Sequence, residues 1–266
     1  MGALRAADGR SGDAAEPPQR RRPPAGWALP PRATPRSGRP ANPTMLRRIK
    51  MAAKLAISRT SYGRFIGYRY SYSFSPRQLS FLTVCIDRTA ALTGGIAEIG
   101  CFLGYTSIFL NVHMNEERIE KPYYALDTFS GFVPEQLEYE RAARGKAPVF
   151  ALMRTAFTGN SQALFDRQLA WNGITRVRSI RADAAAFDYA SIGPLSFALI
   201  DVDLYIPVLR ALEKVVPLMQ PGGMVVVDDC TPGQYYDGAL QAYTEFTAGR
   251  GLPFKVVHKK LGLIEL

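Results

Sequence analysis

From residue 75 to the end of the chain, short apolar runs alternate with stretches in which apolar residues recur every three or four positions. The short runs predict five strands, at residues 96–100, 123–127, 177–182, 195–201 and 224–228. The periodic stretches predict helices between most of them. Two further strands, at 254–258 and 261–266, have no helix between them and should form an antiparallel hairpin at one edge. We therefore expect an α/β fold: a doubly wound, mainly parallel, seven-stranded sheet of the Rossmann-like class.

Local signals set three boundaries in this pattern. Ser75 followed by Pro76 predicts a helix start, with serine as the N-cap and proline in the first turn. Pro221-Gly222-Gly223 predicts a turn directly before the fifth strand. Residues 132–173 are polar and helical without a strand signal, so we interpret them as an insert that forms a lid over the ligand-binding end of the sheet.

The N-terminal part of the chain has a different composition. Residues 1–44 hold nine of the 19 prolines, which predicts a disordered tail, or an upstream extension whose true start is Met45. Residues 45–74 form a basic segment with interleaved aromatics, and the domain proper spans 75–266. The acid-free stretch 45–64 could instead be a targeting sequence or bind an anionic surface. The aromatics of 61–74 could stack on bases, but packing against the neighbouring domain is the simpler interpretation.

Net charge sharpens this division. Residues 1–77 carry 16 of the 33 Lys and Arg residues and only three acids, which gives a net charge of +13. Because the whole chain has a net charge of +10, residues 78–266 have a net charge of −3. The basic character therefore belongs to one end, not to a basic nucleic-acid-binding domain. The three cysteines argue against a disulfide framework, and the two histidines argue against a multi-histidine metal site and a Ser-His-Asp hydrolase. The N-terminal region lacks the apolar stretch of a signal peptide, and no apolar run reaches the length of a membrane span. We expect a cytoplasmic protein without a membrane span.

A glycine loop follows the first strand. It reads Glu98-Ile-Gly100-Cys-Phe-Leu-Gly104-Tyr105-Thr106, and the next helix begins there. A dinucleotide fingerprint starting at Gly100 would need glycine at positions 102 and 105, which are Phe and Tyr. The spacing resembles instead the first motif of class I methyltransferases, in which such a loop wraps the methionine part of S-adenosylmethionine and the acid, here Glu98, helps to orient it. A glycine turn that only tightens the strand–helix junction is the alternative.

Two aspartates close the next strands. Asp127 ends the second strand, where a carboxylate in a doubly wound fold can accept hydrogen bonds from ribose hydroxyls. Asp183 ends the third strand, where methyltransferases of this class bind the adenine. Each aspartate could alternatively serve only as a helix cap.

Four carboxylates follow strands four and five. They are Asp201, Asp203, Asp228 and Asp229, and the carboxyl ends of adjacent parallel strands should bring them together. Packed carboxylates raise one another's pKa unless a cation intervenes, and an oxygen-only set suits Mg²⁺. Capping and solvated turns are the alternative.

These segments together resemble the macrocin O-methyltransferase family, whose members methylate hydroxyls of sugars on natural products. The resemblance runs from about residue 75 to the C-terminus and rests on Glu98–Thr106, YYALDTF (123–129), IDVDLY (200–205), PVLRALEKVVPLMQPGG (207–223) and VVVDD (225–229). It implies Mg²⁺ held by Asp201, Asp228 and Asp229, a sugar-like diol as substrate and a possible homo-oligomer. Catechol O-methyltransferases share the layout more distantly, but their lysine base is replaced here by Leu204.

The predicted activity is therefore S-adenosylmethionine-dependent, Mg²⁺-assisted O-methylation of a sugar-like hydroxyl, with no nucleic-acid partner. Asp203, or Asp201 itself, could act as general base, since residues 132–173 contain no histidine. Two alternatives stay open: a hydroxylase-like relative of the same fold, and a polyanion-binding protein that acts through its basic N-terminal segment.

Overall fold

The computed structural model describes residues 43–60, residue 70 and residues 72–266 of the 266-residue chain. The chain divides into two compact units, Met1–Arg69 and Tyr70–Leu266, and each is considered by itself. In the first unit the described part is one helix, α1 (Pro43–Ser58), and the short turn that follows it. Most of the predicted disordered tail, residues 1–42, lies outside the described residues.

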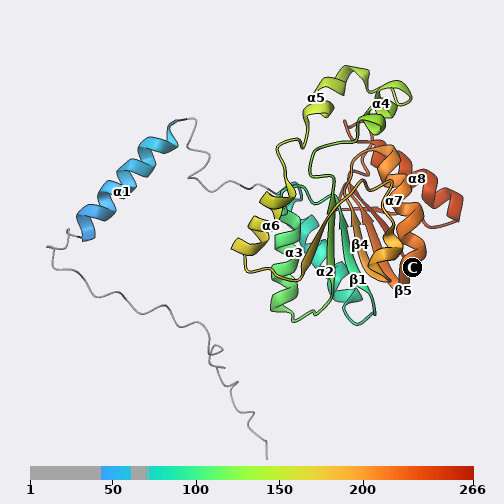
Figure 1. The fold of residues 1–266 in the computed structure, drawn as a ribbon, viewed down its shortest axis with the longest axis horizontal. Coiled ribbons are helices and arrows are strands. Elements are labelled where there is room, and N and C mark those ends of the chain that lie inside the picture. Colours follow the sequence, from blue (N-terminus) through green and yellow to red (C-terminus); the bar gives the residue numbers. More distant parts are fainter. Residues whose placement is uncertain (1–42, 61–69, 71) are drawn as a thin grey trace, which may run out of the picture. The chain divides into compact units, whose positions relative to one another are not determined.

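The second unit contains a seven-stranded sheet in the order β3-β2-β1-β4-β5-β7-β6 (Figure 1). Strands β1 to β5 are parallel, and β7 runs antiparallel between β5 and β6. The predicted α/β class and the antiparallel edge hairpin are thus confirmed. The strands are β1 (Gly95–Ile99), β2 (Tyr123–Asp127), β3 (Val177–Arg181), β4 (Leu195–Ile200), β5 (Met219–Val227), β6 (Val256–Val257) and β7 (Leu261–Glu265).

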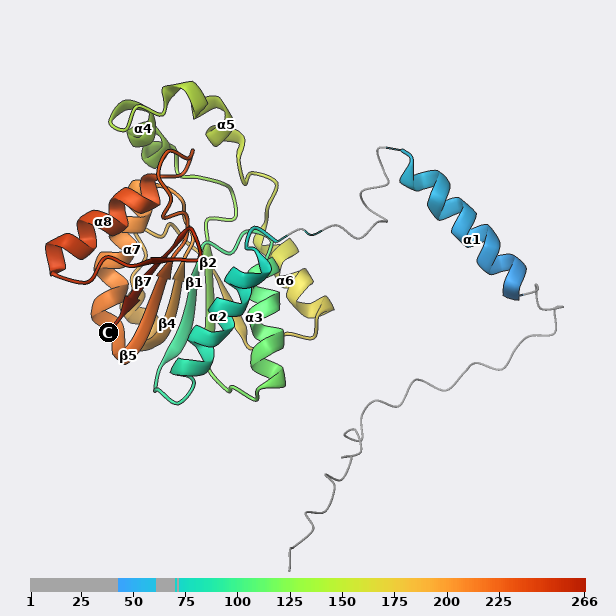
Figure 2. The ribbon, with the colours of Figure 1, turned by 180° about the vertical axis from the view of Figure 1, so that it is seen from behind.

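Helices cover both faces of the sheet, as the two opposite views show (Figures 1 and 2). One face carries α2 (Pro76–Thr89), α3 (Tyr105–Glu116) and α6 (Gln162–Trp171), and the other carries α7 (Tyr205–Val215) and α8 (Gly238–Arg250). Each face has its own apolar core, because β1, β4 and β5 are apolar on both sides. A strand buried on both faces lacks the regular alternation of polar and apolar residues seen in a half-exposed strand, which is why β1, β4 and residues 224–227 of β5 are mostly apolar in sequence.

The start of α2 agrees with its sequence signals. The Gln78 backbone N–H donates to Ser75 Oγ at 3.4 Å, and the Ser75 N–H donates to Gln78 Oε1 at 2.7 Å, which completes a capping box. Just before it, Phe74 is buried and Tyr72 contacts the rings of Tyr105 and Phe109. The expectation that these aromatics pack on the domain is confirmed for both; Tyr62, Phe65 and Tyr68 lie outside the described residues.

Two expectations about boundaries need correction. The chain does bend at 221–223, since Met219 pairs with Leu195 but Met224 with Phe197 and Gly222 has φ +80°. The bend lies within β5 and not before it, because the Gly222 N–H donates to Leu266 O at 2.6 Å and the Leu266 N–H donates to Gly223 O at 3.0 Å. The insert 132–173 is not one lid. Its first part holds α4 (Pro134–Ala142), η2 (Ala147–Val149) and α5 (Phe150–Thr155), whereas α6 is a crossover helix whose Phe165 and Leu169 belong to the core.

Two short 3₁₀ turns complete the second unit. η3 (Tyr189–Ile192) connects β3 to β4, and η4 (Val216–Leu218) leads from α7 into β5. No helix among the described residues is long and apolar enough to cross a membrane.

Candidate active site

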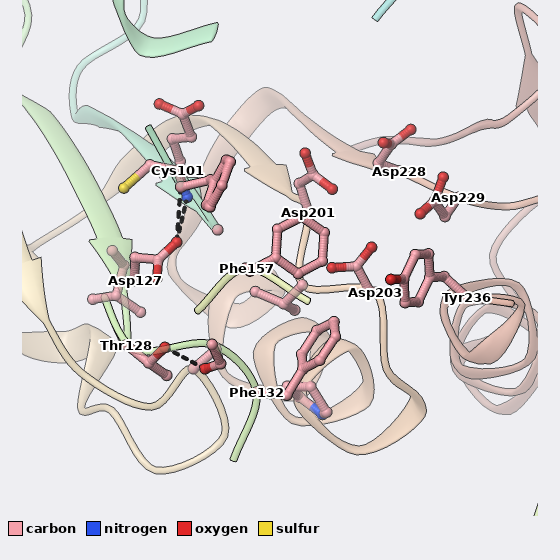
Figure 3. Close-up of a pocket in the computed structure, with 18 of the residues that line it drawn as sticks. Cys101, Asp127, Thr128, Phe132, Phe157, Asp201, Asp203, Asp228, Asp229 and Tyr236 are labelled. Atoms are coloured by element: carbon pink, nitrogen blue, oxygen red, sulfur yellow. Dashed lines mark hydrogen bonds between the residues drawn. The ribbon is translucent and has the colours of Figure 1, made fainter. Parts of the chain in front are cut away.

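One cavity of about 300 Å³ lies at the carboxyl ends of the parallel strands. Its wall combines the loop after β1, the ends of β2 and β3, and the segments after β4 and β5. Every predicted site residue except Gly104 lines this cavity, and Gly104 lies within the glycine loop that does. The lining residues are Glu98, Gly100, Tyr105, Thr106, Asp127, Asp183, Asp201, Asp203, Asp228 and Asp229. Figure 3 shows the four aspartates from β4 and β5 on one side of the cavity and Asp127 on the other. The topology therefore brings the glycine loop and the acidic residues to one place.

The glycine loop is shaped by two positions that require glycine. Gly100 has φ +90°, and a Cβ there would lie 1.8 Å from the Asp201 carbonyl oxygen. Gly104, the N-cap of α3, has φ +83°, and a Cβ there would lie 2.9 Å from the Phe165 ring. Gly100 thus lets the chain turn against the end of β4, and Gly104 lets α3 start beside α6 with free N–H groups.

Asp127 holds this loop in place. Its Oδ2 accepts hydrogen bonds from the backbone N–H groups of Cys101 at 3.1 Å and Phe102 at 2.8 Å, and its Oδ1 accepts one from Phe129 at 2.7 Å. A carboxylate has about four lone-pair sites, so one remains for a ligand hydroxyl. The structure therefore gives Asp127 a loop-positioning role beside the predicted ribose contact.

Glu98 is buried at the base of the loop. It accepts hydrogen bonds from Ser107 Oγ and, at 2.8 Å, from Tyr123 Oη. Burial raises the pKa of Glu98 to about 7, although both hydroxyl donors oppose that shift. Glu98 is therefore tied to β2 and α3 while its carboxyl group faces the cavity wall.

Asp183 connects the end of β3 to α4. Its Oδ1 accepts from Gln136 Nε2 at 2.8 Å and from the Ala185 N–H at 2.9 Å. Asp183 is therefore not the cap of a helix: its side chain closes a turn, and the residue lines the cavity.

The four aspartates after β4 and β5 lie close together in a strained backbone. Asp203 and Asp229 both have left-handed φ angles, 62° and 57°, which non-glycine residues adopt rarely and mostly at functional sites. Burial and the neighbouring carboxylates raise the pKa of Asp201 and of Asp203 well above the usual range, and burial raises the pKa of Asp228 to about 6. A bound proton or a nearby positive charge would therefore stabilise this cluster of carboxylates.

Lys260 supplies part of that positive charge, although no sequence motif predicted it as a site residue. Its Nζ donates to Asp228 Oδ2 at 2.6 Å and to Asp229 Oδ1 at 3.2 Å. The carboxylates raise the pKa of Lys260 above its usual value, so it is a cation and not a base. A signal was present: β7 runs antiparallel to β5, with Val227 opposite Gly262, so the residue before β7 must lie at the carboxyl end of β5.

The ion pair affects the predicted metal ligands. Within the described part of the chain, no group of three or more His, Cys, Asp or Glu side chains is arranged to hold a metal ion. Asp201, Asp228 and Asp229 line the same cavity, but Lys260 takes one oxygen each of Asp228 and Asp229. The other oxygen of Asp228, Oδ1, is buried without a hydrogen-bond partner.

An aromatic wall stands beside the acidic residues (Figure 3). Phe157 contacts the rings of Phe102, Phe132 and Tyr236, with centroids 5.2, 5.3 and 6.1 Å away. Burial, together with the nearby aspartate charges, raises the pKa of Tyr236 to about 12, so its hydroxyl stays protonated. Phe132 and Phe157 fall within the predicted lid, whereas Phe102 and Tyr236 come from other segments and were not predicted to join them. Together they give the cavity an apolar face beside its charged one.

The first part of the insert is fixed to the domain by a buried ion pair. Glu140 on α4 pairs with Arg144, and Arg144 also contacts Asp237 at 3.0 Å. Glu140 Oε1 accepts from the Tyr205 N–H at 2.8 Å, at the start of α7. The segment that carries Phe132 and Gln136, both of which line the cavity, is therefore fixed to the domain.

A comparison with protein families now identifies the chain. Residues 97–230, half of its length, match the methyltransferase domain family. The chain belongs to this family. The match begins in β1 and ends just after Asp229, so it contains the glycine loop and all four aspartates. The protein is thus a methyltransferase enzyme, S-adenosylmethionine is its cofactor, and the hydroxylase-like alternative is disfavoured.

Solved structures support the same fold. The O-methyltransferase NovP is 19% identical, with a TM-score of 0.62 over 71% of this chain and 79% of that one. The calicheamicin methyltransferase CalS11 is 15% identical, with a TM-score of 0.55 over 85% of this chain and 93% of that one. No curated protein matches the sequence.

Proposed function

We propose that this methyltransferase acts on oxygen, and that its acceptor is a hydroxyl of a sugar or of a glycosylated natural product. One observation carries the proposal: the loop from Gly100 to Thr106 and the four aspartates line the same cavity. A methyl donor bound by the loop and an acceptor hydroxyl bound by the carboxylates would therefore lie next to each other. NovP is an O-methyltransferase and CalS11 is a calicheamicin methyltransferase, which favours the same chemistry here.

The residues around the loop fit the cofactor. S-adenosylmethionine supplies an electrophilic methyl group on a sulfonium. Glu98 and Asp127 bring carboxyl groups to the cavity wall, and Tyr105 and Thr106 stand at the start of α3. The loop has no glycine at positions 102 and 105, so its path differs from that of a pyrophosphate-binding loop.

Proton removal from the acceptor is assigned to Asp203 or Asp201. In its deprotonated form, a carboxylate with a raised pKa accepts a proton more readily than an ordinary one, and burial together with the adjacent carboxylates raises the pKa of both. Of the described residues that line the cavity, none is a histidine, and Lys260 is charged. Alignment of acceptor and methyl group can contribute about 7–11 kcal/mol to such a displacement, and the fixed lid would provide it.

We include Mg²⁺ in the proposal because the carboxylate oxygens of the aspartates are the type of ligand that this ion prefers. Asp201, Asp228 and Asp229 would hold the ion, and the unpartnered Asp228 Oδ1 is a buried oxygen that such an ion would satisfy. When bound, Mg²⁺ would act as a Lewis acid that lowers the pKa of the acceptor hydroxyl. The ion pair with Lys260 is the opposing feature, because it shares the same two side chains.

The aromatic wall favours a cyclic acceptor with a flat apolar face and polar edges. Phe132, Phe157 and Tyr236 would contact that face, and the carboxylates would accept hydrogen bonds from vicinal hydroxyls. A pyranose has both features.

The test is methyl transfer from S-adenosylmethionine by the full chain to a panel of glycosides, nucleotide sugars and catechol. We expect transfer to a sugar hydroxyl, and a loss of at least 100-fold, the order of a missing general base, in Asp203→Asn or Asp201→Asn. Asp87→Asn, at an exposed aspartate that pairs with His113 outside the cavity, is the matched control and should keep full activity.

Two results would oppose parts of the proposal. Transfer to catechol with none to any sugar would reject the acceptor class. Activity that survives both EDTA and Asp228→Asn would reject the role of Mg²⁺ and leave O-methylation intact.

A further inference from the structure

The helix α1 (Pro43–Ser58) has a surface that the methyltransferase reaction does not use. Met45, Ile49, Ala53 and Ile57 recur every four residues and therefore form one apolar stripe along the helix. Arg47, Lys50 and Lys54 fall on a second stripe beside it. Figure 1 draws α1 as one uninterrupted helix, about 24 Å long at 1.5 Å per residue.

Charge on α1 has a single sign. The helix contains Arg47, Arg48, Lys50 and Lys54 and no acidic residue. Its ends lack the acids that would favour a helix N-terminus in isolation. A negatively charged partner would therefore complement this helix.

Within its own unit, no described residue covers the apolar side chains of α1: Met45 is 63% exposed and Ile49 55% exposed. A partner that accepts apolar side chains would remove this surface from water. A nucleic acid would neutralise the basic stripe but leave the apolar one in water, and a second copy of α1 would repel the first.

We propose that α1 lies in the interface of an anionic lipid bilayer, with its apolar stripe among the acyl chains and its lysines and arginines at the headgroups. An interfacial helix needs an apolar stripe, a basic face and low overall hydrophobicity. Lysine and arginine stems next to the apolar stripe can reach up to the headgroups from such a depth. Spanning is excluded for α1, since no described helix is long and apolar enough. The helix is thus a peripheral anchor, independent of the reaction in the cavity.

The test is co-sedimentation of the full chain with vesicles of phosphatidylcholine alone and of phosphatidylcholine with about one third phosphatidylserine. We expect binding to the anionic vesicles alone, weakened by salt. Lys50→Ala/Lys54→Ala should reduce the partition coefficient about 30-fold, since each basic residue near such a surface contributes about fivefold. Ile49→Asp should abolish binding.

The matched control is Arg88→Ala/Lys255→Ala, which removes two exposed basic side chains from the methyltransferase unit and should leave vesicle binding unchanged. Failure of the full chain to bind anionic vesicles would overturn the proposal. It would also be overturned if Ile49→Asp bound as the parent does while the double lysine variant did not, because charge alone would then explain the interaction.

Discussion

Replacement of Asp127 by asparagine tests how the glycine loop is held. The carboxylate accepts three backbone N–H groups, two at Oδ2 and one at Oδ1. Asparagine can keep its oxygen towards Cys101 and Phe102, but its amide nitrogen then faces the Phe129 N–H. One donor loses its acceptor, and two charge-assisted hydrogen bonds become neutral ones.

The expected cost follows from those counts. An unsatisfied buried donor costs about 1–3 kcal/mol, and each charge-assisted bond loses about 1 kcal/mol when its acceptor becomes neutral. We therefore expect Asp127→Asn to lower the free energy of unfolding by about 3–5 kcal/mol. Asp127→Ala, which leaves all three N–H groups without the carboxylate, should cost more.

The assays are urea unfolding and calorimetry with S-adenosylhomocysteine. Because the same amides shape the cofactor loop, Asp127→Asn should also weaken affinity at least tenfold, about 1.4 kcal/mol. Asp188→Asn is the matched control: its carboxylate accepts one exposed N–H, from Ala190 at 3.1 Å, which asparagine can still accept. The reasoning is refuted if Asp127→Asn changes stability by no more than the control and binds the ligand as the parent does.

Three further predictions concern the same cavity. Gly100→Ala should lower the free energy of unfolding, measured in urea, by about 3 kcal/mol or more. In the control, Gly145→Ala, the residue has φ +70° and no neighbour within 4 Å of the added Cβ, so only the backbone strain of about 1 kcal/mol is expected. Equal losses in the two variants would contradict the close approach of Gly100 to the end of β4. Burial raises the pKa of Glu98 from 4.5 to about 7, so the folded state holds a proton that the unfolded chain has released, and stability should fall by about 3 kcal/mol as pH rises through that window. Urea unfolding at a series of pH values should show a shallower slope in Glu98→Gln than in the parent, the remainder coming from Asp201, Asp203 and Asp228, whose pKa values are also raised. Lys260→Met should tighten Mn²⁺ binding, measured by electron paramagnetic resonance, because it frees one oxygen each of two aspartates; unchanged affinity would mean that the ion pair does not compete.

The sheet was predictable because its signals are local. β1, β4 and the second half of β5 are buried on both faces, so each appears in the sequence as a mostly apolar run, with Glu98 in β1 and Ser196 in β4 as the polar exceptions. The rule that parallel strands end at one edge then predicts that the segments after β1, β2, β4 and β5 share a cavity. This is why the sequence alone points to Glu98, Asp127 and Asp201.

The parts that were missed depend on distant contacts. The turn residues 221–223 correctly predict a bend, but the continuation of β5 across it requires hydrogen bonds to Leu266, which is distant in sequence. The core position of α6 depends on Phe165 meeting the Gly104 turn. Lys260 meets Asp228 across 32 residues, and only the register of β7 on β5 reveals it.

The central claim is that the cavity binds S-adenosylmethionine next to the acidic residues. Calorimetry of the full chain with S-adenosylhomocysteine, with and without Mg²⁺, tests it most directly. The account predicts saturable binding of one ligand per chain, weakened at least tenfold in Asp127→Asn and unchanged in Asp188→Asn. Absence of a binding signal under both conditions would contradict it.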